Sequence, residues 1–182
     1  MPTTTTTLRA LNNLDDTPAT LADSTLILVD YQNTYVSGVM ELHGWRTHLT
    51  PPPPCWNRPA RSGSTVIRVV NDGVDVCGQI DTGEGGGGLD DDRLALGGGH
   101  ARVDHADLGP DVVGFMTHMC VLATTRSAFR RGNRPIVVAD ACATRPLRSA
   151  DTDLTAVQIH HRALAMIGDL YGVVVASGKS LT

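Results

Sequence analysis

Residues 111–120 read DVVGFMTHMC, an apolar run that leads directly into a predicted helix. The apolar residues 111–115 predict a buried strand. The segment 119–131 lacks glycine and proline, carries two arginines in its last turn and is followed by Gly-Asn, which together indicate a helix and its end. Cys120 therefore lies where a strand is followed by a helix. Because a thiol reacts as the thiolate and a helix N-terminus lowers its pKa, Cys120 is a candidate nucleophile.

Core packing is the alternative explanation for Cys120. A free cysteine behaves as a small apolar side chain, and such cysteines are among the most buried residues of proteins. A single cysteine is also a weak signal of catalysis. On position alone, packing is the more common outcome.

The fold class follows from the alternation of strands and helices. Four further short apolar runs, rich in β-branched residues, predict buried strands over 25–30, 65–70, 135–139 and 172–176. A second helix is predicted over 151–170, from side chains at helical spacing: Leu154, Val157, His161, Leu164 and Ile167. This βαβ series predicts an α/β fold, with a doubly wound, mostly parallel sheet and helices on both faces.

The same fold predicts the location of a reactive site. In open α/β sheets, ligands bind at the carboxyl ends of the strands. Asp30 ends the first predicted strand, and Cys120 follows the strand over 111–115. We therefore expect the two side chains to meet at one edge of the sheet, which favours chemistry over packing for Cys120.

Composition narrows the class of protein. The chain has 182 residues, of which 41% are hydrophobic, and its formal net charge is −4. This length and composition predict a single domain over 1–182. We expect no nucleic acid partner, since aromatic residues make up only 4% and no basic stripe is present. No apolar run approaches the roughly 18 residues that cross a bilayer, so we expect no membrane partner.

Cysteine usage and the N-terminal residues bear on the compartment. The chain has four cysteines without a C-x-x-C pair: Cys55, Cys77, Cys120 and Cys142. We interpret them as free thiols in a reducing compartment. The threonine tract near the N-terminus has neither the charged nor the apolar region of a signal peptide. A cytoplasmic protein is therefore expected.

The middle of the chain has an unusual composition for this fold. The prolines 51–54 stand where a helix should join the first two strands, and each proline costs a helix interior about 3 kcal/mol. Residues 74–110 are rich in glycine and aspartate and poor in apolar residues, which predicts a long mobile loop. The α/β fold is therefore expected to be disrupted in the middle of the chain.

Three motifs, in order along the chain, resemble those of one superfamily. The first strand ends in Asp30-Tyr31-Gln32-Asn33, residues 114–121 read GFMTHMCV, and residues 137–144 read VVADACAT. An aspartate after the first strand, a G-x-x-T-x-x-C-V turn and an Asp-Ala strand end together resemble the isochorismatase-like cysteine hydrolases. Within that superfamily, the stretches 114–121, 131–147 and 169–181 are most similar to the streptothricin hydrolase-like amidases.

The resemblance implies a hydrolase that cleaves an amide or lactam C–N bond of a small molecule through a thioester. It implies that Cys120 is the nucleophile and Asp30 the general base. It also implies a cis peptide bond between Phe115 and Met116, with the backbone N–H groups of Met116 and Cys120 forming an oxyanion hole. The remaining implications are a homo-oligomer and no cofactor. We also expect substrate contacts from Gln32, Tyr35, Phe115 and His118. The rings of Tyr35, Trp45 and Phe115 are candidates for an apolar pocket wall, and core packing is an equal alternative for them.

One element of the superfamily has no counterpart here. Its members carry a catalytic lysine before the cysteine strand, whereas the lysine of this chain is Lys179, near the C-terminus. Loss of that lysine should raise the thiol pKa. We therefore keep an alternative function, a catalytically impaired member that binds a ligand or partner without turnover. The position of the missing lysine falls in the middle of the chain, where the composition is unusual for this fold. We interpret residues 50–61 and 74–110 as a degraded or wrongly framed stretch.

A loop in this middle region has residue types that bind metals: His100, Asp104, His105 and Asp107. The related nicotinamidases bind zinc through aspartate and histidine, but this chain lacks the matching Asp-x-His arrangement after its first strand. We interpret the four residues as solvent-exposed, and we predict no metal site.

Overall fold

The structure, a computed structural model, describes residues 5–20, 24–31, 35, 37–42, 44–45 and 109–181, and the backbone of 66–69. The predicted loop over 74–110 lies almost entirely outside these residues, as do Gln32, Cys55 and Cys77. The four polar loop residues between 100 and 107 also lie outside them. Within the described residues, no helix is both long and apolar enough to cross a membrane.

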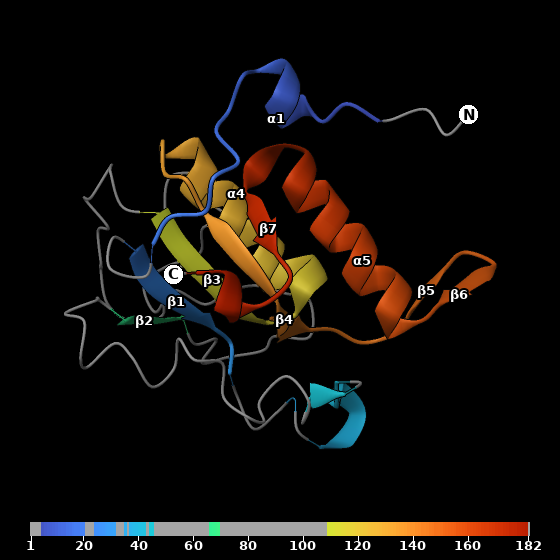
Figure 1. The fold of residues 1–182 in the computed structure, drawn as a ribbon. Helices are drawn as coiled ribbons and strands as arrows, with labels where there is room; N and C mark the ends of the chain where they lie inside the picture. The colour runs from blue at the N-terminus through green and yellow to red at the C-terminus, as the bar shows by residue number, and fades with distance from the viewer. Residues whose placement is uncertain are drawn as a thin grey trace, which may run out of the picture.

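A five-stranded parallel sheet forms the centre of the molecule (Figure 1). Its strands, in spatial order, are β2 (Val66–Val69), β1 (Ser24–Val29), β3 (Gly109–Phe115), β4 (Ile136–Ala143) and β7 (Val173–Val175). All five lie where the apolar runs predict them, which confirms the α/β fold. The difference is in β4, which continues past residue 139 to Ala143.

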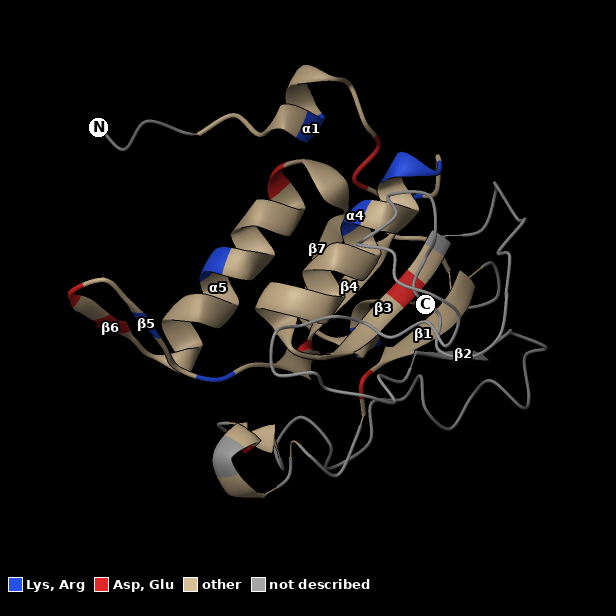
Figure 2. Cartoon of the chain, turned by 180° about the vertical axis from the view of Figure 1, so that it is seen from behind, with Lys and Arg blue, Asp and Glu red and all other residues tan. Residues whose placement is uncertain are grey.

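Two helices follow the strands of this sheet, and the views agree that they lie side by side (Figures 1 and 2). The first is α4 (Leu122–Arg130), preceded by a π-helical turn, η5 (Thr117–Val121). The second is α5 (Ala156–Met166), which continues into a π-helical turn, η6 (Ile167–Tyr171). The α5 helix packs against η5, and α4 packs against η6. The predicted helix over 119–131 is thus confirmed, apart from the π winding of its first turn.

The predicted start of the second helix at residue 151 is wrong. A two-stranded antiparallel hairpin, β5 (Leu147–Ser149) with β6 (Thr152–Leu154), occupies that stretch. Helix α5 begins after Thr155, whose side chain accepts from the backbone N–H of Gln158 while the Gln158 side chain accepts from the N–H of Thr155. Such a reciprocal cap satisfies N–H groups that a helix start leaves free, so it determines where the helix begins.

The predicted apolar face of this helix is also wrong in part. Val157 is 54% exposed and His161 is exposed as well. The buried positions are instead Ala156, Ile159, Ala163 and Ile167. Alanine carries little hydrophobicity in a sequence pattern, yet its small side chain allows a helix to pack closely on its neighbours.

The hydrophobic core lies on both faces of the sheet, because alternate residues of a strand point in opposite directions. Val112 of β3 packs in one cluster with Ile167 of η6. Val113, the next residue, packs in a second cluster with Leu181 near the C-terminus. The helices therefore cover one face, and the C-terminal segment contributes to covering the other.

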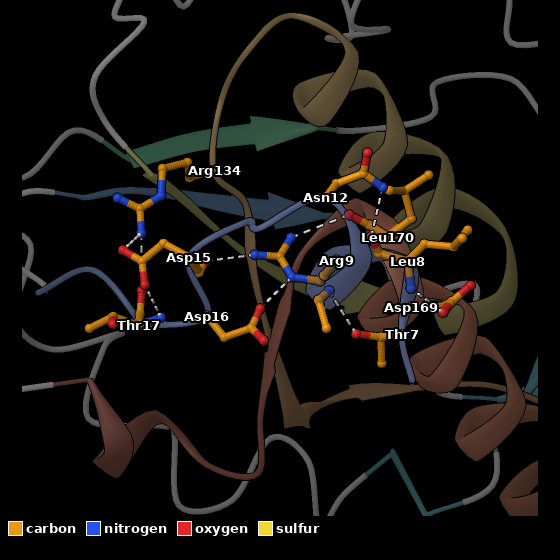
Figure 3. Close-up of polar contacts among 11 residues, drawn as sticks. Thr7, Leu8, Arg9, Asn12, Asp15, Asp16, Thr17, Arg134, Asp169 and Leu170 are labelled. Carbon is orange, nitrogen blue, oxygen red and sulfur yellow. Dashed lines mark hydrogen bonds and ion pairs between the residues drawn. The ribbon is translucent and has the colours of Figure 1, made fainter. Parts of the chain in front are cut away.

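The N-terminal segment is fastened to the body of the fold through Arg9 of α1 (Leu8–Leu11) (Figure 3). Arg9 is 6% exposed, and its guanidinium donates to the carboxylate of Asp16 at 2.6 Å and to the backbone carbonyl of Leu170 at 3.3 Å. Arg134, before β4, contacts Asp15 at 2.6 Å. Residues far apart in sequence thus anchor the N-terminal segment to η6 and to the turn before β4.

One buried acid interrupts the apolar surface of the sheet. Asp111 of β3 is 1% exposed. Ser24 donates to its Oδ2 at 2.7 Å, whereas its Oδ1 is buried with no hydrogen-bond partner. Burial raises the pKa of Asp111 to about 6, although the Ser24 hydrogen bond opposes the rise. The carboxyl group is therefore best tolerated in its protonated form.

We expect Asp111→Asn to stabilise the fold above pH 6 and to change little in acid. The raised folded-state pKa means that protonation favours the folded state; this contribution is complete below the unfolded value of 3.8 and is lost as pH rises through about 6. Removing the charge should gain up to about 3 kcal/mol at neutral pH. Urea unfolding at several pH values measures the effect. A gain that does not depend on pH would contradict this explanation.

The matched control for Asp111→Asn is Asp153→Asn. Asp153 lies on the short strand β6 with a side chain that is 80% exposed, near Arg148 at 3.8 Å. Exposed ion pairs contribute about 0–1 kcal/mol, so this variant should hardly change the unfolding free energy.

Candidate active site

The order of the strands places the candidate site at a switch in topology. From β1, the chain continues to β2 on one side, and β3 lies on the other side of β1. Ligands of open α/β sheets bind at the carboxyl ends of the strands where the strand order reverses. Asp30 follows β1 and Cys120 follows β3, so the structure brings the two predicted residues to this point.

Asp30 is held in an uncommon backbone conformation at this edge. Its φ is 50°, in the left-handed region, which aspartate tolerates better than most residues. Its side chain belongs to a residue only 2% exposed. The Cys120 thiol lies within hydrogen-bonding reach and donates to the Asp30 carboxylate. The aspartate is therefore buried and directed at the sulfur.

Gly114 allows β1 and β3 to approach each other closely behind the site. Its φ is 133°, and a Cβ at this position would lie 1.9 Å from the backbone oxygen of Val29. Only glycine fits there, because the clash would be with backbone. Directly after it, the peptide bond between Phe115 and Met116 is cis, as the sequence resemblance implies. This backbone leads into η5, which carries Cys120.

The backbone of the nucleophile turn surrounds the sulfur with donors. The N–H groups of Met116 and Cys120 are both directed at the Cys120 sulfur, and both act to lower its pKa. These are the two groups that the sequence assigns to an oxyanion hole. Carbonyl attack by the sulfur would place a developing negative oxygen near the same donors.

The pKa of Cys120 departs from the direction that its place before a helix predicts. Burial, the hydrogen bond to Asp30 and the negative charge of Asp30 raise it to about 12, against the two backbone donors. The sequence argument that a helix N-terminus lowers this pKa is therefore wrong for the isolated protein. The reason is that Cys120 lies within a buried π-helical turn beside a carboxylate, and both effects disfavour the thiolate.

Aromatic side chains pack against the site. Phe115 lies edge-on to Tyr31, with ring centroids 4.7 Å apart, and to Tyr35, at 6.1 Å. Burial, followed by the charges of Asp30 and Cys120, raises the pKa of Tyr35 to about 12, which places this tyrosine near the reactive pair. Phe115 and Tyr35 are 1% and 3% exposed. In this structure both rings are therefore packed in the core, the alternative left open by the sequence.

His118, two residues before Cys120, is fixed by the chain that follows β4. Its Nδ1 is hydrogen-bonded to the hydroxyl of Thr144. Burial and the positive charge of Arg145 lower the pKa of His118, so its ring is neutral at neutral pH. A neutral, anchored imidazole beside the nucleophile turn is available for substrate contacts.

Sequence reasoning missed two residues that belong to this region. His160 of α5 is hydrogen-bonded through Nδ1 to the hydroxyl of Thr117, at 2.9 Å. Arg145 follows β4 and acts on His118. Thr117 lies in the motif around Cys120, so its hydroxyl could have indicated a hydrogen-bond partner. That partner, His160, was missed because the sequence assigns the wrong residues to the buried face of α5.

Within the residues that the structure describes, no three or more side chains of His, Cys, Asp or Glu gather in a way that could hold a metal ion. The site chemistry available there is that of a thiol, a carboxylate, an imidazole and a guanidinium. These groups suit attack on a carbonyl and recognition of a polar substrate.

Comparisons with known proteins agree with this geometry. Residues 112–169 match the isochorismatase domain family. An uncharacterised isochorismatase family protein of Bacillus subtilis, YddQ, is 41% identical over 63 residues, which is 35% of each chain. The chain therefore matches only about a third of that relative's length.

Solved structures extend the likeness over the whole fold. A crystal structure of an isochorismatase from Pseudomonas putida has a TM-score of 0.76 and 27% identity, covering 98% of this chain and 100% of that one. A cysteine hydrolase from Pseudomonas syringae has a TM-score of 0.64 and 16% identity, covering 90% and 93%, which is a likeness of fold alone. The family match over residues 112–169 and the Pseudomonas putida structure agree with the superfamily predicted from the sequence motifs.

Proposed function

Given its place in the isochorismatase-like superfamily, we propose that this chain is a cysteine hydrolase that forms a thioester at Cys120. One observation carries the proposal: the Cys120 thiol is hydrogen-bonded to the buried carboxylate of Asp30 while two backbone N–H groups are directed at the sulfur. A thiol, a carboxylate and two backbone donors thus meet at one point, which supports the roles of nucleophile, base and oxyanion hole.

The mechanism follows from these positions. As Sγ of Cys120 attacks the substrate carbonyl carbon, the thiol proton passes to Asp30 and the carbonyl oxygen becomes an oxyanion held by the N–H groups of Met116 and Cys120. The C–N bond then breaks, and the leaving nitrogen takes the proton from Asp30. A water molecule, deprotonated by Asp30, attacks the thioester; the acid leaves and the proton returns to the sulfur. Oxyanion donors contribute about 3 kcal/mol each in other enzymes.

The high pKa of Cys120 gives Asp30 a central part in this scheme. With its pKa raised to about 12, the thiol is almost entirely protonated at neutral pH. A preformed thiolate therefore contributes little. Attack depends instead on proton transfer to Asp30 during bond formation, as in general base catalysis.

The proposed bond is an amide or lactam C–N bond of a small molecule, by the likeness of 114–121, 131–147 and 169–181 to the streptothricin hydrolase-like amidases. We further propose a homo-oligomer and a cytoplasmic location, with no nucleic acid or membrane partner. These finer assignments rest on the sequence.

A second candidate function is ligand binding without turnover. Two observations favour it: no lysine of the sequence stands where the superfamily carries its catalytic lysine, and the pKa of Cys120 is raised rather than lowered. In that case the site around Cys120 and Asp30 would bind a carbonyl compound without cleaving its C–N bond.

Trapping of the acyl-enzyme distinguishes the two functions. After brief exposure to p-nitrophenyl acetate and an acid quench, we expect one acetyl group on the tryptic peptide that contains Cys120, removable by hydroxylamine. Mass spectrometry measures the adduct. The peptide with Cys142 is the internal control, since this thiol is 0% exposed and burial raises its pKa to about 12 as well. Equal acetylation of the two peptides, or none, would favour binding without turnover.

A further inference from the structure

Arg145 lies at the same edge of the sheet as Cys120. It is the second residue after β4 (Ile136–Ala143), and β4 is the neighbour of β3, which leads into the nucleophile turn. Its Nε is buried and has no hydrogen-bond partner. In the described part of the chain, ion pairs are formed by other arginines, among them Arg9, Arg134 and Arg148. A buried guanidinium donor without an acceptor is uncommon, and it indicates a place for an anionic group.

The neighbours of Arg145 place it next to the nucleophile turn. Thr144, the preceding residue, is hydrogen-bonded to Nδ1 of His118, and His118 precedes Cys120 by two residues. The charge of Arg145 also lowers the pKa of His118, which requires the guanidinium to lie near that imidazole. Arg145 and His118 therefore lie at the same edge of the sheet as Cys120.

The buried acid at this edge acts on other groups. Asp30 acts on Cys120 and Tyr35. His118, which is neutral, carries no charge to balance the guanidinium. Another buried atom without a hydrogen-bond partner is Oδ1 of Asp111. Asp111 lies near the start of β3, at the opposite end of that strand from Cys120. The unpaired donor beside the nucleophile turn is thus the Nε of a cation.

We propose that Arg145 binds a carboxylate of the substrate, so that the chain acts on amides that carry a carboxylate close to the scissile carbonyl. The planar guanidinium presents its Nε and Nη donors as a fork that matches the two oxygens of a carboxylate. This inference rests on the proposed function, since it assigns the substrate class of the same site. Arg145 is accordingly a residue of substrate specificity.

Two alkylating reagents of nearly equal size test the inference without requiring turnover. Iodoacetate carries a carboxylate and iodoacetamide a neutral amide, and both react at the thiol. We expect the ratio of the iodoacetate rate to the iodoacetamide rate at Cys120 to fall about tenfold in Arg145→Gln, which corresponds to the loss of one charge-assisted contact. Arg145→Lys should retain an intermediate ratio. Peptide mass spectrometry measures both rates.

The matched control is Arg148→Gln, which removes the same charge three residues further along. The Arg148 side chain is 74% exposed and faces Asp153 at 3.8 Å. The ratio should stay within about twofold of the wild type, because screened surface charges act weakly at a distance. An equal fall in both variants would overturn the inference by showing a general effect of net charge. An unchanged ratio in Arg145→Gln would overturn it as well.

Calorimetry provides a readout that needs no reactive thiol. Glutarate should bind the wild-type chain, and glutaramide should not; binding of both, or of neither, at millimolar concentration would overturn the inference. Failure of the proposed function has a different signature. If no acyl-enzyme forms but glutarate still binds through Arg145, the anion site stands and the hydrolase assignment does not.

Discussion

Cys120→Ser lowers hydrolysis of any substrate of this chain by about a thousandfold or more, while leaving the fold intact. The substitution exchanges sulfur for oxygen with little change of volume at a partly buried position. A serine hydroxyl is a much weaker acid than a thiol, so the Asp30 carboxylate cannot activate it to a comparable extent. Loss of a nucleophile commonly costs several orders of magnitude.

Hydrolysis by the Cys120→Ser protein is measured against the wild type with the same activated ester, and circular dichroism shows whether the fold is kept. The matched control is Cys142→Ala, which removes the other cysteine that the structure describes. Cys142 is 0% exposed and packs in the core cluster that contains Val112. This control should lose some stability, as a small core cavity predicts, and should keep its turnover once folded.

Two outcomes would contradict the assignment of Cys120. Full turnover in Cys120→Ser would show that the bond is broken by another group. An equal loss in Cys142→Ala, with both proteins folded, would show that the rate depends on the packing of the sheet and not on a particular sulfur.

The sheet could be predicted from the sequence because its strands are continuous β-branched runs. Such runs are buried on both faces, so they stand out without any knowledge of the partners. The hairpin over 147–154 could not be predicted in this way. Its strands are three residues each and largely polar, and the pairing depends on the two strands meeting rather than on local hydrophobicity.

The residues of the site could be predicted, but their electrostatics could not. The motif around Cys120 and the strand order suffice to bring Asp30 to the same edge. The pKa of Cys120 depends on how closely that carboxylate approaches and on the depth of burial, which Gly114 helps to set by allowing β3 close to β1. The unpaired donor of Arg145 is likewise visible only when its surroundings are known.

Asp30→Asn changes two rates at Cys120 in opposite directions. We expect alkylation by iodoacetamide at neutral pH to become severalfold faster, and hydrolysis to become about a hundredfold slower or more. The amide nearly matches the carboxylate in shape, and asparagine tolerates the left-handed φ of 50° at this position as well as aspartate does. The backbone of the site should therefore be preserved.

The first change follows from the causes of the raised pKa. Burial raises the pKa of Cys120, and the hydrogen bond to Asp30 and the charge of Asp30 raise it further. Asparagine removes the charge, so the pKa should fall from about 12 towards the value that burial alone would give. Each unit of pKa increases the thiolate population tenfold, although a less basic thiolate attacks more slowly. In the wild type, by contrast, alkylation should rise with pH throughout the neutral and alkaline range.

The second change follows from the proton that attack releases. An asparagine cannot accept it, so acylation loses its base even though more of the sulfur is ionised. The matched control is Asp140→Asn, an exposed aspartate of β4 whose charge acts on Cys142. It should change neither rate at Cys120. If Asp30→Asn slows alkylation and hydrolysis together, Asp30 supports the shape of the site and is not the base. If it speeds alkylation and leaves single-turnover acylation unchanged, the proton leaves by another route, and the thiol is activated without Asp30.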